Sequence, residues 1–195
     1  LMKDPIAAFS SSWLASTFDM ATIVLVRHPA GFASSLKRLG WSHPFNDFLA
    51  QPALMEERLQ AFEGEIARMA KVEHDIVDQA SLLWRMIYSV LLEYRRAHPD
   101  WIVVRHEDLA LDPVGGFARL YRQLGLGYSE DIRRRVRWYS SGSPELEADA
   151  GAYAIRRASE QAIQGWRQRL SAEEQSRLRA QVEPLATRFY ADSEW

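Results

Sequence analysis

An arginine stands at the end of an apolar run near the start of the chain. Arg27 follows Thr22–Val26, whose β-branched residues predict a buried strand, and Pro29 is typical of a helix start. Free backbone N–H groups and the helix dipole favour an anion there, and a guanidinium adds donors suited to phosphate oxygens. Ser34 and Ser35 lie on the next turns, and their hydroxyls tilt back toward the same place. The pattern predicts a phosphate site; the alternative is that Arg27 pairs with a carboxylate and the serines lie on a solvated face.

A second polar cluster follows a second apolar run. Trp101–Val104 predicts another strand, and Arg105, His106, Glu107 and Asp108 come directly after it. Ligands of open parallel sheets bind beyond the carboxyl ends of the strands, so both junctions are candidates for one site. From its own surroundings, His106 is expected to be a strand-end histidine that a neighbouring carboxylate satisfies.

The elements that position these residues alternate between strand and helix. Both strands read as buried on two faces, and their order predicts an α/β fold with a short parallel sheet and right-handed crossovers. Helical periodicity and capping signals predict a helical C-terminal segment as well. The expected helices span residues 29–39, 55–70, 74–97, 113–125 and 131–138, followed by a last helix from the capping box Ser171–Glu174 to about Tyr190.

Composition narrows the class of protein. The 195 residues fit one domain, and the absence of cysteine excludes disulfides, thiolate metal sites and cysteine nucleophiles. A net charge of -2 gives no overall positive field that would attract nucleic acid. The arginine run Arg133–Arg137 is expected to be a solvated helix face. The histidines show no metal-ligand spacing.

The chain shows no signal for insertion into a membrane. The most apolar stretch, Ala80–Leu92, contains Arg85 and is shorter than the roughly 20 residues that a spanning helix needs. The N-terminal residues lack the pattern of a signal peptide. We therefore expect a cytoplasmic protein, whose oligomeric state the sequence leaves open.

Three ordered motifs, spread over nearly the whole chain, resemble those of the sulfotransferases that use 3′-phosphoadenosine 5′-phosphosulfate. The first matches their 3′-phosphate-binding motif, the second their strand–helix segment, and the third their C-terminal helices. The motifs are Leu25–Pro29 with Ala33–Leu36; Val104–Leu109 with Asp112, Pro113 and Leu120–Leu126; and Trp166, Arg167 and Leu170–Glu174.

The resemblance implies a role for each candidate residue. Arg27 and Ser35, with Ser34 beside them, would bind the nucleotide 3′-phosphate, and His106 stands where the family often has a tyrosine that touches the adenine. Lys3, in a Lys-Asp-Pro segment similar to that of tyrosylprotein sulfotransferases, would face the sulfuryl group as the catalytic cation. No metal is implied, and neither the acceptor nor its general base can be identified.

The chain departs from the family in one respect. No glycine-rich loop that could cradle the 5′-phosphosulfate occurs in the sequence, and Leu1 is an unusual first residue. We therefore expect residues 1–195 to be a single P-loop-like, three-layer sulfotransferase domain that is truncated at its N-terminus.

The expected function is transfer of a sulfuryl group from 3′-phosphoadenosine 5′-phosphosulfate to an acceptor hydroxyl or amine, on a glycan, a peptide or a small molecule. Two alternatives stay open. One is a non-catalytic nucleotide-binding or interaction module derived from the same fold. The other is a relative of the P-loop kinases, which share the sheet architecture.

Overall fold

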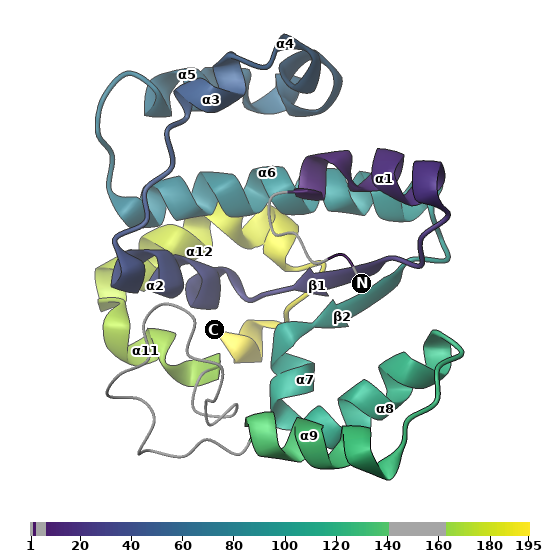
Figure 1. Cartoon of the computed structure of the whole chain (residues 1–195). Coiled ribbons are helices and arrows are strands. Elements are labelled where there is room, and N and C mark those ends of the chain that lie inside the picture. The colour runs from purple at the N-terminus through teal and green to yellow at the C-terminus, as the bar shows by residue number, and fades with distance from the viewer. Residues whose placement is uncertain (1, 3–6, 141–162) are drawn as a thin grey trace.

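The computed structural model describes residue 2 and residues 7–140 and 163–195, and it is mostly helical with one small sheet (Figure 1). The strands are β1 (Ile23–Val26) and β2 (Ile102–Arg105). The helices are η1 (Ala7–Ser10), α1 (Ser11–Phe18), α2 (Pro29–Leu39), α3 (Asn46–Leu49), α4 (Pro52–Leu54), the π-helical turn η2 (Met55–Leu59), η3 (Gln60–Phe62), α5 (Glu63–Met69), α6 (Ile76–Ala97), α7 (His106–Leu111), α8 (Pro113–Gln123), α9 (Glu130–Ser140), α11 (Trp166–Arg169), α12 (Ala172–Ala186) and η5 (Asp192–Glu194).

The two strands pair in parallel, which confirms the predicted mixed α/β class, although the sheet is small. The register pairs Ile23 with Ile102 and Val26 with Arg105. The residues after the strands, Arg27 and His106, therefore begin the chain segments that leave the same edge of the sheet.

The expectation that β1 is buried on both faces is wrong. Val24 and Val26 are 7% and 0% exposed, whereas Ile23 and Leu25 are 40% and 49% exposed. A continuous apolar run carries no period-2 signal, so it cannot distinguish a strand covered on one face from a strand covered on both. One side of β1 packs into the core, and the other presents apolar side chains to solvent.

The helix boundaries follow local capping chemistry. The α2 helix spans the predicted residues, with Pro29 in its first turn and Gly40 in the left-handed conformation (φ 61°) that ends it. At the start of α12, the Ser171 hydroxyl accepts a hydrogen bond from the Glu174 backbone N–H, and the Glu174 carboxylate accepts one from the Ser171 N–H. The predicted capping box is thus confirmed.

The long helix α6 is the centre of the core. It packs against α2 and α12 on one side of the sheet, while α7, α8 and α9 lie on the other side (Figure 1). Leu82, Trp84, Met86 and Val90 of α6 are all buried. Contacts from this helix therefore set the position of the end of β1.

The last helix is shorter than expected. It ends at Ala186 instead of about Tyr190, and the chain then turns so that Tyr190 is buried at 3% exposure. Residues 187–195 run back toward the carboxyl ends of the strands (Figure 1). Burial of an aromatic side chain outweighs the weak helical preference of a polar C-terminal segment.

Within the part of the chain that the structure describes, no helix is both long and apolar enough to cross a membrane.

The two sides of β1 predict opposite responses to the same substitution. Ile23→Thr with Leu25→Thr should change the free energy of unfolding little, because those side chains are exposed, and should reduce any self-association through the apolar face. Val24→Thr with Val26→Thr should cost about 1–3 kcal/mol at each site, because each buries a hydroxyl. Urea unfolding and sedimentation velocity measure both effects, and equal destabilisation by the two pairs would contradict the assigned faces.

Candidate functional site

Arg27 is held at the end of β1 by two aromatic side chains of α6. Its backbone N–H donates to the Tyr88 hydroxyl at 3.0 Å, and its carbonyl accepts from the Trp84 indole N–H at 2.8 Å. Burial raises the pKa of Tyr88 to about 12, so this phenol stays neutral. The main chain of Arg27 is therefore fixed before any ligand arrives.

The side chain of Arg27 meets the predicted partner Ser35. Its guanidinium Nη2 donates to Ser35 Oγ at 2.9 Å, and both residues are half-buried. The guanidinium lies along the first turn of α2, since a Cβ built on Gly31 would be 3.5 Å from Arg27 Nε. The spacing of eight residues thus places an arginine, a hydroxyl and the start of a helix together.

Ser34 does not join this pair. It is 1% exposed, and its hydroxyl accepts a hydrogen bond from Arg169 Nη1 of α11 at 3.1 Å. Consecutive helix residues lie about 100° apart, so Ser34 and Ser35 cannot both face Arg27 closely. In this structure its contact connects α2 to the C-terminal helices, and a role for Ser34 at the phosphate stays a prediction.

His28, next to Arg27, is enclosed by aromatic rings. Its Nδ1 accepts from the Ala30 backbone N–H at 3.2 Å and so caps α2. The ring stacks on Trp166 with centroids 5.3 Å apart and meets the edges of Tyr190 and Trp195. Burial lowers the pKa of His28 to about 4, so the imidazole is neutral at pH 7.

Glu107 is the largely buried anion of the site, with 12% of its side chain exposed. Its Oε1 accepts from the His28 backbone N–H and its Oε2 accepts from the Tyr190 hydroxyl, both at 2.9 Å. Burial alone would raise the pKa of Glu107, but the neighbouring His106 and these hydrogen bonds outweigh it and lower the pKa to about 2. Burial also raises the pKa of Tyr190, with a further contribution from the Glu107 charge.

His106 lies beside this carboxylate. Its Nδ1 is 3.8 Å from Glu107 Oε1, which is too long for a hydrogen bond, and its side chain is 36% exposed. His106 thus lies at a strand end next to an acid, as expected, but its Nδ1 forms no hydrogen bond with that carboxylate, so the expectation that the acid satisfies it is not met. Lys3 lies outside the described residues, so its catalytic role stays a prediction.

The C-terminal residues cover the carboxyl end of β2. Arg105 forms an ion pair with Glu194, and its Nη1 donates to the Phe189 carbonyl at 3.1 Å. Arg167 donates to the Trp195 carbonyl at 3.0 Å. This segment fills space beyond the strand end, where ligands of open parallel sheets usually bind.

Sequence reasoning missed His28, Tyr190 and Glu194 as parts of this site. The dipeptide His28-Pro29 at a strand end offered a capping signal, because a polar side chain before proline is a common helix start. Tyr190 and Glu194 gave no local signal, because they lie more than 80 residues from Glu107 and Arg105 in the chain.

The described residues of this arrangement offer hydrogen-bond donors to an anion, while His28 and Glu107 are already engaged. Arg27 and Ser35 offer donors at a helix start, whereas His28 is enclosed and both oxygens of Glu107 are used. Across the described ranges, no group of three acidic or histidine side chains could hold a metal ion.

Neither a family model, nor a curated protein, nor a solved structure matches this chain.

His28 predicts a specific loss of stability in mild acid. Its pKa is about 4 in the folded protein and 6.5 ordinarily, so the unfolded chain binds more protons between these values. Stability from this group is complete above pH 6.5 and falls by roughly 3 kcal/mol as the pH drops to 4. His28→Asn, which keeps a capping side chain, should flatten this fall in urea unfolding between pH 7 and 4.5.

The pH range over which stability is lost distinguishes the effect of His28 from that of Glu107. The pKa of Glu107 is depressed to about 2, so its contribution is present above its ordinary value of 4.5 and is lost only below that pH. An unchanged pH dependence in His28→Asn would show that the imidazole is not buried in its neutral form.

Proposed function

We propose that this chain carries the 3′-phosphate-binding part of a sulfotransferase that uses 3′-phosphoadenosine 5′-phosphosulfate. The observation that carries the proposal is the contact between Arg27 Nη2 and Ser35 Oγ at the junction of β1 and α2. A strand-end arginine and a helix hydroxyl in contact, beside a helix N-terminus, are the donor set that a phosphate monoester needs.

The chemistry of the pair suits a dianion. The guanidinium is charged at every physiological pH, and a hydroxyl can turn its proton toward an incoming oxygen. Tyr88 and Trp84 hold the main chain of Arg27, so little order has to be gained on binding. A phosphate would accept from both side chains, and their mutual hydrogen bond would be exchanged for two charge-assisted ones.

The reaction would move the sulfuryl group from the phosphosulfate to an acceptor oxygen or nitrogen. The bond from sulfur to the phosphate oxygen breaks, a bond to the acceptor forms, and the acceptor loses its proton. The nucleotide 3′,5′-bisphosphate is the leaving group. As in phosphoryl transfer, positioning and cations would supply most of the catalysis, and Lys3 is the proposed cation for the moving group.

The finer fold assignment belongs to the same proposal. A parallel β1–β2 pair with α6 on one side and α7–α9 on the other supports a P-loop-like, three-layer arrangement. The sequence has no glycine-rich phosphate loop, so the part of the site proposed here is the 3′-phosphate half. Its direct test is therefore nucleotide binding.

One observation favours a non-catalytic nucleotide-binding or interaction module instead. Tyr190 and Glu194 bond to Glu107 and Arg105 at the strand ends, so the C-terminal segment occupies part of the space beyond the strands, where ligands of open parallel sheets usually bind. A module needs only the nucleotide contact, whereas a transferase also needs room for the acceptor.

The proposal predicts a preference for a 3′-phosphate. By calorimetry, the chain should bind adenosine 3′,5′-bisphosphate more tightly than adenosine 5′-monophosphate. Arg27→Ala should weaken binding of the bisphosphate about 10- to 100-fold, because a hydrogen bond to a charged group is worth about 1.5–3 kcal/mol. It should leave the weaker binding of the monophosphate unchanged.

Arg38→Ala is the matched control, because it removes an exposed arginine from the same helix. It should retain the wild-type preference. Equal affinities of the wild-type chain for the two nucleotides, or equal losses in both variants, would refute the phosphate site. If the preference is found, displacement of the bisphosphate by 3′-phosphoadenosine 5′-phosphosulfate would indicate that the same site binds the sulfuryl donor.

A further inference from the structure

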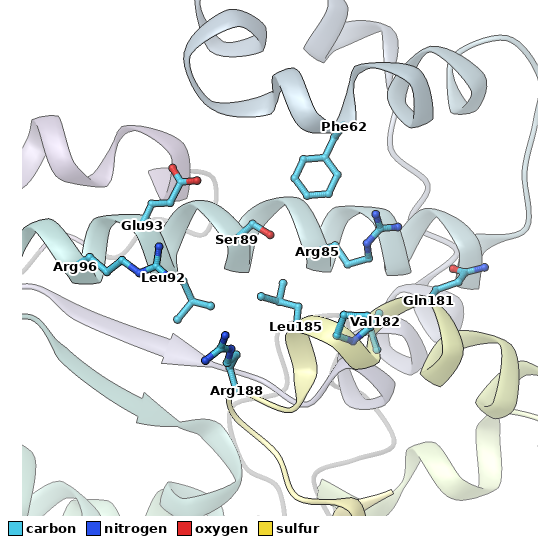
Figure 2. Close-up of a pocket in the computed structure, with 11 residues that line it drawn as sticks. Phe62, Arg85, Ser89, Leu92, Glu93, Arg96, Gln181, Val182, Leu185 and Arg188 are labelled. Atoms are coloured by element: carbon cyan, nitrogen blue, oxygen red, sulfur yellow. The ribbon is translucent and has the colours of Figure 1, made fainter.

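A groove between α6 and α12 lies away from the nucleotide candidate. Its volume is about 560 Å³, which is within the range of small-molecule sites. Trp84 and Tyr88 of α6 hold the end of β1, and the residues that follow them in the helix, Arg85 and Ser89, line the groove. Figure 2 shows the other lining residues around it, among them Phe62, Leu92, Arg96, Val182, Leu185 and Arg188.

The middle of the groove is apolar. Leu92 and Leu185 are half-buried and face the same space from the two helices, with Val182 buried beneath them (Figure 2). Phe62 of η3 lies across α6 and closes one end. Arg85 at that end is already occupied, since it pairs with Glu65 at 2.8 Å and its guanidinium lies over the Phe62 ring.

The other end of the groove is cationic. Arg96 and Arg188 are exposed, and within the described residues neither forms an ion pair or a side-chain hydrogen bond. Figure 2 shows Arg188 beside Leu92 and Leu185; the acidic Glu93 also lines the groove but forms no ion pair with either arginine. An anion placed at this end would meet two unpaired arginines and one carboxylate, so the local charge there is still positive.

Size argues against a protein partner. The lining of α6 extends from Arg85 to Arg96, which is about 16 Å of helix at 1.5 Å per residue. A stable protein–protein contact buries roughly 800 Å² on each side, far more than a groove of this length presents. An open groove with leucines in its middle and two unpaired arginines at one end fits a small amphiphile with one anionic end.

We propose that this groove binds a single-chain amphiphilic carboxylate, with the alkyl chain along Leu92 and Leu185 and the carboxylate between Arg96 and Arg188. Apolar burial supplies affinity along the chain, and the two guanidinium groups select the anionic end. The proposal does not depend on the nucleotide site, because Arg27 and Ser35 take no part in it.

The test is calorimetric titration of the whole chain with dodecanoate below its micelle concentration. We expect one site, with dodecanol and dodecyltrimethylammonium at least tenfold weaker because they lack the negative charge. The double variant Arg96→Glu and Arg188→Glu should weaken dodecanoate binding tenfold or more. The pair Arg96→Lys and Arg188→Lys keeps the charge and should retain most of the affinity.

The matched control is Arg95→Glu with Arg122→Glu, which makes the same change in net charge at two exposed arginines outside the groove. It should bind dodecanoate like the wild type. Equal binding of the three alkyl probes, equal weakening by the two double variants, or no binding by the wild type would each overturn the proposal. Adenosine 3′,5′-bisphosphate binding reports independently on Arg27, so the two proposals can fail separately.

Discussion

A largely buried carboxylate connects the three parts of the chain that meet beyond the strands. Glu107 accepts hydrogen bonds from the His28 backbone N–H and the Tyr190 hydroxyl, so it joins the end of β1, the start of α7 and the C-terminal segment. A buried charge is costly unless hydrogen bonds satisfy it, and removing one partner leaves the penalty uncompensated. The Glu107 carboxylate therefore needs His28 and Tyr190 to stay in their folded positions.

This constraint also determines what Arg27 can do. Glu107 fixes the residue after Arg27, while Tyr88 and Trp84 fix the main chain of Arg27 itself. The guanidinium reaches along the first turn of α2 and donates to Ser35, so the side chain is held as well. Affinity for an anion at such a place comes from donors ordered in advance, since a flexible arginine would lose side-chain entropy on binding.

The features that were predictable from the sequence are those with local causes. Pro29 and Gly40 mark the ends of α2, and the spacing of eight residues brings Arg27 to Ser35. The exposed face of β1 was not predictable, because Ile23 and Leu25 are as apolar as their buried neighbours. Long-range partners were missed for a different reason: the contact between Ser34 and Arg169 joins residues 135 positions apart, and no periodicity records such a pairing.

The C-terminal turn after α12 connects the two candidate sites. Arg188 lines the groove, and the next residue, Phe189, packs its ring against Trp84 and Tyr88 while its carbonyl accepts from Arg105. The α6 residues that hold Arg27 are thus covered by the same turn that supplies a cation to the groove. Coupling between two sites needs an element whose arrangement both ligands influence. Residues 188 and 189 meet that requirement, because Arg188 lines the groove while Phe189 packs against the α6 residues that hold Arg27.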